Sequence, residues 1–126
     1  MANAQRDFIK EVEESKSNLS GATLMRASLE GANLVNANLK NAQMMGAFLM
    51  GTNLMGANLM GANLSDANLR AAHLEDAQLG GANLKGANLR GAKLMGVDLR
   101  NAKNLSQTQI DSAITDKSTQ LPDIIK

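Results

Sequence analysis

The chain has no cysteine and very little aromatic volume. Without cysteine, neither a disulfide nor a thiolate metal site can form. Aromatic residues make up 2% of the 126 residues, and they are Phe8 and Phe48. We therefore expect a narrow hydrophobic core built from small side chains, not the wider core of a β-sandwich or an α/β domain.

An excess of one charge and long hydrophobic runs are also missing. Lys and Arg total 13, Asp and Glu total 12, and the formal net charge is +1. This balance gives no strong attraction to nucleic acid or to an anionic membrane. No run of about 18 apolar residues could span a bilayer, and the highly charged first 17 residues are unlike a signal peptide. These absences predict a cytoplasmic protein.

A five-residue repeat dominates residues 18 to 103. A large apolar residue occupies every fifth position from Leu19 to Leu99, and it is leucine everywhere except at Met44, which gives 17 consecutive units. Alanine stands two residues before this centre in 14 of the 17 units, and asparagine is the usual residue between them. Gly, Asn or Asp stands two residues after the centre in 15 of the 17 units. The unit therefore reads Ala-Asn-Leu-x-Gly.

A period of five fits neither an α-helix nor a straight strand. Five residues turn a helix by about 500°, so successive leucines would drift by about 140°, and on a strand they would alternate between faces. A chain that bends every five residues gives each Leu and Ala the same inward position and leaves the other three positions outward. Gly, Asn and Asp suit such bends because they tolerate positive φ. Since Arg26 and Ala71 occupy this bend position instead, we expect their bends to avoid positive φ.

The stretch from Asn18 to Ala102 resembles the pentapeptide-repeat family, whose consensus is Ala-(Asp/Asn)-Leu-x-x. The resemblance covers about two-thirds of the chain and holds one register through all 17 units. It implies an all-β solenoid, a right-handed quadrilateral β-helix with four units in each coil. We therefore expect about four coils here, capped by a short helix at each end.

The first part of the chain predicts a helical cap. Residues 1–17 precede the repeat, and residues 4 to 16 have a helical pattern with Asn3 as the N-cap. Phe8, Ile9 and Val12 form a short apolar face on this helix. The repeat region, residues 18–103, forms the shaft. Because an open solenoid end exposes backbone edges and core leucines, we expect this apolar face to cover the first coil of the shaft.

The last part, residues 104–126, predicts a second cap. Ser106 and Gln109 have the spacing of a capping box, and a short helix is expected at about 107 to 114. The tail, including Ile124 and Ile125, is expected to fold back as part of the lid. This arrangement looks like the C-terminal cap of bacterial members of the family.

Methionine is concentrated on one part of the predicted surface. Residues 41 to 65 carry no charge, and four methionines at outward positions would form a belt around the shaft together with Phe48. Clustered apolar groups on a surface often mark an interface, and methionine suits adaptable contacts. Where two faces meet, the register gathers Met25, Met45, Phe48 and Met50. This candidate patch predicts a protein partner or self-association; the alternative is that a rigid surface simply tolerates methionine.

No group of residues in the sequence has the pattern of an active site. His73 is the single histidine, and neither a cysteine nor a second histidine accompanies it as a metal ligand. The adjacent carboxylates of Glu75 and Asp76 diverge around a bend, which does not favour an acid–base pair. A packed Leu/Ala shaft also offers no cleft for a small-molecule substrate. We predict no catalytic residue, cofactor or metal site, and no enzymatic activity.

The sequence favours a structural or protein-interaction module whose partner it does not identify. One alternative is a DNA mimic that binds a type II topoisomerase (gyrase), as quinolone-resistance members of the family do. Mimicry requires a strongly acidic shaft, and residues 18 to 103 hold eight basic and five acidic residues, so this reading is disfavoured. Nucleic-acid binding is disfavoured as well, because no aromatics accompany the basic residues to stack bases. A second alternative is peripheral membrane contact through the methionine belt.

Overall fold

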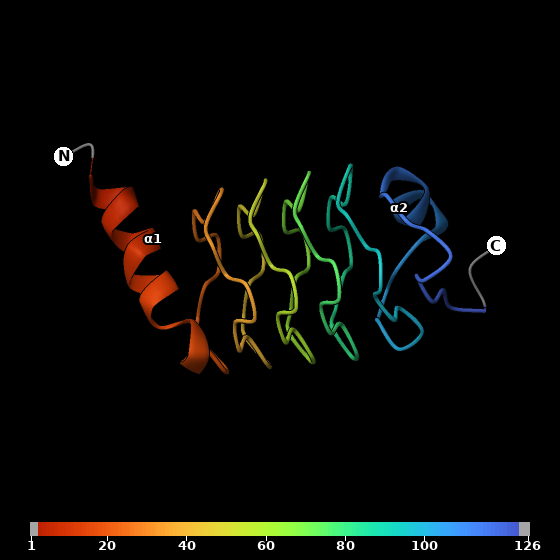
Figure 1. Cartoon of the computed structure of the whole chain (residues 1–126), viewed down its shortest axis with the longest axis horizontal. Helices are drawn as coiled ribbons and strands as arrows, with labels where there is room; N and C mark the ends of the chain where they lie inside the picture. The colour runs from red at the N-terminus through yellow and green to blue at the C-terminus, as the bar shows by residue number, and fades with distance from the viewer. Residues whose placement is uncertain (1–2, 124–126) are drawn as a thin grey trace.

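Short parallel bridges define the architecture of the chain. The computed structural model describes residues 3–123, which form a stack of coils between two helical ends (Figure 1). The helices are α1 (Ala4–Glu14), the 3-10 helix η1 (Lys16–Asn18) and α2 (Gln107–Ser112). Within residues 3–123, no helix has the length and hydrophobicity needed to span a membrane.

The coils are stacked with a register of twenty residues. Parallel bridges join residues twenty apart, from Thr23 with Gln43 to Asn83 with Lys103. Because each side uses five residues, this register places four sides in each coil, as the resemblance implies. The main chain follows the same register: the Asn53 N–H donates to the Ala32 carbonyl at 2.9 Å, one coil earlier.

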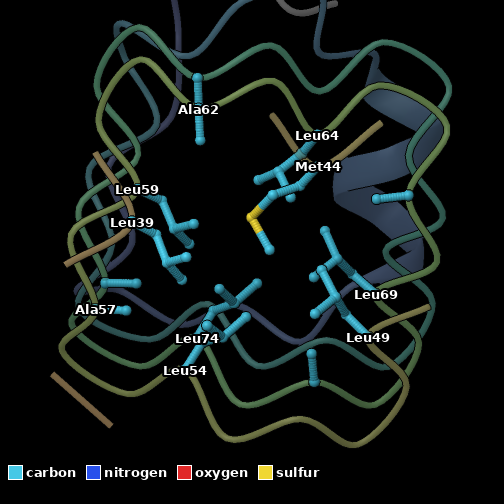
Figure 2. Close-up of a cluster of buried hydrophobic side chains, with 14 of the residues drawn as sticks. Leu39, Met44, Leu49, Leu54, Ala57, Leu59, Ala62, Leu64, Leu69 and Leu74 are labelled. Carbon is cyan, nitrogen blue, oxygen red and sulfur yellow. The ribbon is translucent and has the colours of Figure 1, made fainter. Parts of the chain in front are cut away.

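The centres of the repeat line the interior of this stack. All 17 centres from Leu19 to Leu99 are buried, as predicted. Figure 2 shows leucines and Met44 projecting into the interior from the surrounding chain. The alanine positions are buried from Ala32 onward, and at one of them the Thr52 hydroxyl donates to the Leu29 carbonyl at 2.7 Å. Each buried leucine contributes about 1.5–3 kcal/mol relative to exposure.

The bends are β-turns of one kind. In each unit, the carbonyl of the centre accepts a hydrogen bond from the N–H three residues later, as between Leu69 and Ala72 at 3.1 Å. The residue two after the centre has positive φ at every bend from Gly21 to Gly96. Positive φ at the third turn residue, combined with this hydrogen bond, identifies type II turns.

The prediction that Arg26 and Ala71 avoid positive φ is wrong. Their φ angles are 57° and 58°, like those of the glycine bends. The reason lies in the neighbouring coil, because the Arg26 N–H donates to the Met45 carbonyl and the Ala71 N–H to the Arg90 carbonyl, both at 2.9 Å. The left-handed conformation costs about 1–2 kcal/mol, and leaving it would break the register of the stack. The hydrogen bonds between coils, not the conformational preference of the residue, therefore determine φ at these bends.

The outward asparagines have a defined structural role in the turns. Asn53 Oδ1 accepts from the Met55 N–H at 3.1 Å, and Asn58 Oδ1 accepts from the Met60 N–H at 3.0 Å. The same bond is made at six other asparagines and one aspartate: Asn33, Asn38, Asn63, Asn68, Asn83, Asn88 and Asp98. The asparagine therefore caps a turn amide that the ladder leaves free.

Helix α1 lies across the N-terminal end of the stack (Figure 1). Val12 is buried in the core and Ile9 packs against it, whereas Phe8 is exposed. Glu13 Oε2 accepts from the Asn33 N–H at 2.7 Å, so α1 provides an acceptor for the free edge of the first coil. Asn3 occupies the N-cap position, as predicted, but its backbone is helical and its side chain makes no capping hydrogen bond.

The C-terminal helix is shorter than predicted. Helix α2 ends at Ser112, and Ile114 forms a parallel bridge with Lys93 instead of a further helical turn. This pairing extends the ladder of one side beyond the last repeat. The predicted folding back of Ile124 and Ile125 concerns residues outside the described range.

Candidate interaction surface

The twenty-residue register places outward residues in columns on four sides. We number the sides by their first centres, so that Leu19 begins side one, Leu24 side two, Leu29 side three and Leu34 side four. The residue after each centre heads outward. On side two this column is Met25, Met45, Ser65 and Lys85, and on side three it is Glu30, Met50, Arg70 and Arg90.

The structure brings two of the four candidate-patch residues into one groove. Met25 and Met45 line an open groove of about 640 Å³ on side two, together with Arg26, Gly46 and Asp66. Phe48 and Met50 lie around the next bend, on side three. Met25 is 47% exposed and Phe48 42%, whereas Met45 and Met50 are half-buried.

Exposure alone does not distinguish the candidate patch. Met55 on side four is 38% exposed and Met60 on side one is 40% exposed, so methionine surrounds the shaft. Met60 also reaches over the next coil, where its methyl carbon would lie 3.9 Å from a Cβ placed at Gly80. Another property must separate the patch from the rest of this belt.

That property is the absence of asparagine caps. Four adjoining units on sides two and three carry other residues before the centre: Thr23, Ser28, Gln43 and Phe48. Within residues 3–123, no acceptor reaches the main-chain N–H groups that these units leave free, those of Met25, Glu30, Met45 and Met50. The amides of Met55 and Met60 are capped, as described above. The sequence shows where asparagine is replaced before the repeat centre, but only the structure shows that this asparagine caps a main-chain amide.

A second uncapped group has a different chemical character. It lies on sides four and one, where His73, Gln78 and Lys93 replace asparagine. This region is rich in carboxylates: Glu75, Asp76 and Asp98. Three carboxylates and Lys93 accompany the main-chain donors here, whereas Glu30 and Asp66 are the carboxylates on the sides of the candidate patch.

Unpaired cations continue the columns of the candidate patch. Lys85 lies two coils beyond Met45 on side two, after Ser65, and Arg70 and Arg90 follow Met50 on side three. All three are exposed, and among the described residues none of them forms an ion pair. We call Arg70, Lys85 and Arg90 the basic group. Although the last coils carry basic residues on all four sides, Arg100 on side one is neutralised by Asp98 at 2.8 Å.

His73 and Glu75 form another close side-chain contact. His73 Nδ1 lies 3.4 Å from Glu75 Oε2, and both side chains are half-buried on side four. Glu75 Oε1 is buried without a hydrogen-bond partner in the described chain. Asp76 is directed elsewhere, toward Gly96 in the next coil. The described residues contain no group of three or more His, Asp or Glu side chains placed to hold a metal ion.

Asp98 has a strongly lowered pKa. Its carboxylate accepts from Arg100 Nε at 2.9 Å and from Arg100 Nη2 at 2.8 Å, and Oδ1 also accepts from the Arg100 N–H at 3.0 Å. These bonds favour the ionised form and lower the pKa of Asp98 from 3.8 to about 2. Because the pKa is lower in the folded state, the stabilisation is complete above the unfolded pKa and is lost as pH falls through the folded pKa.

We expect Asp98→Asn to flatten the acid limb of the stability curve. Asparagine keeps the Oδ1 acceptor that caps the turn but removes the titrating charge. The wild type should lose more unfolding free energy between about pH 4 and pH 2 than the variant does. Urea denaturation across this range measures the difference, and parallel curves for the two proteins would contradict the assignment.

Comparison with known proteins identifies the repeat. The family model described as Pentapeptide repeats matches with 8 copies at residues 22–61, 46–76 and 62–101. The crystal structure of the pentapeptide repeat protein Rfr23 from the cyanobacterium Cyanothece 51142 is 43% identical, with a TM-score of 0.63. That match covers 78% of this chain and 63% of Rfr23, so the chain spans less than two-thirds of its relative. A comparison with curated proteins gave no match.

Two further solved structures are pentapeptide repeat proteins from Nostoc PCC 7120. The protein alr5209 is 28% identical, with 92% of this chain and 93% of that chain covered and a TM-score of 0.44. HetL, described as involved in heterocyst differentiation regulation, is 30% identical, with 83% and 53% covered and a TM-score of 0.28. Of these three structures, Rfr23 has the TM-score that supports the shape. The repeats and their solved neighbours imply a right-handed quadrilateral β-helix.

Proposed function

Because the chain belongs to the pentapeptide-repeat family, we propose that it works as a non-enzymatic protein-interaction module. Members of this family are generally structural or interaction modules. The interior is filled by Leu and Ala side chains, so binding surfaces must lie on the outer sides. The eight basic and five acidic residues of residues 18 to 103 do not support a DNA-mimicking role.

We further propose that the chain is organised in three segments. Residues 1–17 form an N-terminal helical cap, residues 18–103 a shaft of about four coils, and residues 104–126 a C-terminal cap and tail. Burial of Val12 in α1 and of Ile110 in α2 supports this division. A shaft closed at both ends leaves its sides as the surface for recognition.

The proposed interaction site is the candidate patch, Met25, Met45, Phe48 and Met50. One observation carries this proposal: exposed apolar side chains coincide with four uncapped main-chain donors on adjoining units of a rigid shaft. Elsewhere in the belt, Met55 and Met60 have comparable exposure but capped amides. A partner that covers the patch would therefore gain both apolar burial and hydrogen bonds. The partner is a protein, either a different protein or a second copy of this chain.

Polar replacement of the patch should weaken association without unfolding the shaft. In the triple variant Met45→Gln, Phe48→Gln, Met50→Gln, three outward side chains lose apolar contact area, each worth about 1.5–3 kcal/mol when fully covered. We expect partner binding or self-association to weaken by at least about tenfold. Solution mass by light scattering and capture from a lysate of the source organism measure the two forms of association.

Met55→Gln with Met60→Gln is the matched control, since it removes methionines that are more exposed than Met45 and Met50 from the opposite sides. It should retain full association, and all three proteins should keep the same circular dichroism spectrum. An unchanged mass together with an unchanged set of captured proteins in the triple variant would reject the patch.

A further inference from the structure

The proposed function does not specify the chemistry of the protein partner. The charges and hydrogen-bonding groups around the candidate patch indicate which chemistry the partner has. Resting on that function, we propose that sides two and three bind an acidic protein segment that carries apolar anchor residues. The apolar part would lie on the candidate patch, and the acidic part would run along the shaft axis over the basic group, Arg70, Lys85 and Arg90.

The first argument is that four main-chain donors at this surface have no partner. The N–H groups of Met25, Glu30, Met45 and Met50 have no acceptor among residues 3–123. A partner that pairs with these amides supplies acceptor oxygens, either carboxylates or main-chain carbonyls. Charge-assisted bonds from an amide to a carboxylate are stronger than neutral ones. The uncapped amides thus favour an acceptor-rich partner.

The second argument is the direction in which the side chains are stacked. Arg70 follows Met50 in the same column of side three, and the Gly51 N–H donates to the Arg70 carbonyl at 3.0 Å. Adjacent coils are about 4.8 Å apart, so Met50, Arg70 and Arg90 fall within about 10 Å along the shaft. A short segment can therefore touch the apolar residues and the basic group at the same time.

The third argument is charge complementarity on this pair of sides. Arg26, Arg70, Lys85 and Arg90 outnumber the acidic residues there, which are Glu30 and Asp66. The Glu30 carboxylate already accepts from Gln5 Nε2 at 3.3 Å. Sides four and one are balanced, with Glu75, Asp76 and Asp98 against Lys40, Lys93 and Arg100. An acidic segment is therefore attracted to sides two and three more than to the other pair.

The groove favours a protein segment over an anionic bilayer. Met45 is half-buried in the groove between corner residues of successive coils, and Arg26 lies over Gly46, where its Cγ would be 3.3 Å from an added Cβ. A chain can enter such a groove and present carbonyls to the uncapped amides. A lipid surface meets it only at the outermost side chains, and binding to vesicles is therefore a distinct outcome.

The test uses a fluorescent synthetic peptide with a leucine–phenylalanine half followed by a glutamate half. Binding to the full chain is measured by fluorescence anisotropy at low and high salt. Arg70→Glu with Arg90→Glu should weaken binding by about tenfold or more at low salt and remove most of the salt dependence. Lys40→Glu with Lys93→Glu makes the same charge change on sides one and four, and it should weaken binding by less than about twofold.

A second pair of variants tests the uncapped amides without changing charge. Thr23→Asn with Gln43→Asn restores the usual repeat residue and should cap the amides of Met25 and Met45. We expect the fold to be preserved and peptide binding to weaken by about three- to tenfold. No change in affinity on restoring these caps would overturn the role assigned to the amides.

Other outcomes separate this inference from the proposed function. The inference is overturned if the peptide does not bind, if the charge-reversed variant binds it equally well, or if phosphatidylserine vesicles bind more tightly than the peptide. If the Met45, Phe48, Met50 triple variant loses its natural association while Arg70→Glu with Arg90→Glu keeps it, the interaction patch stands and the acidic partner is rejected.

Discussion

Replacing Gln109 with alanine should lower the free energy of unfolding by about 2–4 kcal/mol, because three hydrogen bonds are lost at the C-terminal end. Gln109 Oε1 accepts from the Ser106 N–H at 2.8 Å and completes the capping box of α2. Gln109 Nε2 donates to the Leu84 carbonyl at 2.7 Å and to the Ala87 carbonyl at 2.9 Å. Thermal or urea denaturation measures the loss.

The two carbonyls explain why this glutamine matters beyond its helix. One coil earlier, the Ala67 carbonyl accepts from the Asn88 N–H at 2.9 Å. The Ala87 carbonyl occupies the same position, but α2 takes the place of the next side and supplies no main-chain donor. The Gln109 side chain substitutes for that missing ladder bond. The neighbouring residue, Ile110, is buried and covers the core beneath it.

Gln109→Glu separates the two roles of this side chain. A carboxylate keeps the acceptor for Ser106 but cannot donate to the carbonyls of Leu84 and Ala87 when it is ionised. We expect this variant to be destabilised nearly as much as Gln109→Ala at neutral pH. Gln107→Ala, which removes a bond to Asp111 on the same helix, should cost under about 1 kcal/mol. Full stability of Gln109→Glu would show that the capping box alone stabilises this end.

The shaft could be predicted from the sequence because the five-residue period reflects a requirement of the whole fold, that every repeat centre lies inside the same stack. A five-residue period excludes a helix and a straight strand, and it places each centre inside, from Leu19 to Leu99. Features decided by neighbouring coils were predicted less well. Ala71 takes a left-handed conformation because its N–H must meet the Arg90 carbonyl. Likewise, the capping-box pattern located Gln109 at the start of α2 but could not show that its amide reaches Leu84.

The candidate site was predictable only in part for the same reason. The register places Met25 and Met45 on side two, where they line one groove, and Phe48 and Met50 on side three, around the bend and outside the groove. The exposure of each side chain could not be predicted, because it depends on how that side chain lies on the neighbouring coil. The distinction between Met45 and Met55 rests on a hydrogen bond, and it became visible only when the structure showed what Asn53 does.

Gly56→Ala should cost more stability than Gly51→Ala, although both glycines occupy bends of one coil with nearly the same conformation. Their φ angles are 68° and 65°. A Cβ added at Gly51 would meet nothing within 4 Å, whereas a Cβ added at Gly56 would overlap Asn36 Oδ1 from the preceding coil. The difference between the two variants therefore isolates contact between coils from backbone strain.

The expected sizes follow from these two terms. Alanine in the left-handed conformation costs about 1–2 kcal/mol, partly offset by about 0.4–1 kcal/mol from a less flexible unfolded chain. Gly51→Ala should therefore cost about 1 kcal/mol. Gly56→Ala should cost a further 1–3 kcal/mol or so, because the Asn36 side chain must leave the position that the added Cβ would occupy. Urea denaturation of both variants measures the difference.

The overlap at Gly56 reflects a general feature of the stack. Wherever Asn or Asp occupies a bend with glycine twenty residues later, its side-chain oxygen fills the space that a Cβ would need. The pairs are Asn36 with Gly56, Asn41 with Gly61, Asp66 with Gly86 and Asp76 with Gly96. Ala71 leaves that space open, so a Cβ at Gly91 would lie 3.8 Å from the Ala71 nitrogen. The glycine preference at these bends therefore has two causes, of which positive φ is only one.

A double-mutant cycle tests the second cause directly. Asn36→Gly removes the obstructing side chain, so it should recover the additional cost of Gly56→Ala and leave the double variant about as stable as Asn36→Gly combined with Gly51→Ala. Ala71→Gly, where strain acts without overlap, should raise the unfolding free energy by up to about 1 kcal/mol. Equal costs for Gly51→Ala and Gly56→Ala, with no coupling to Asn36, would mean that bend glycines are required by φ alone and that stacked coils impose no residue choice on one another.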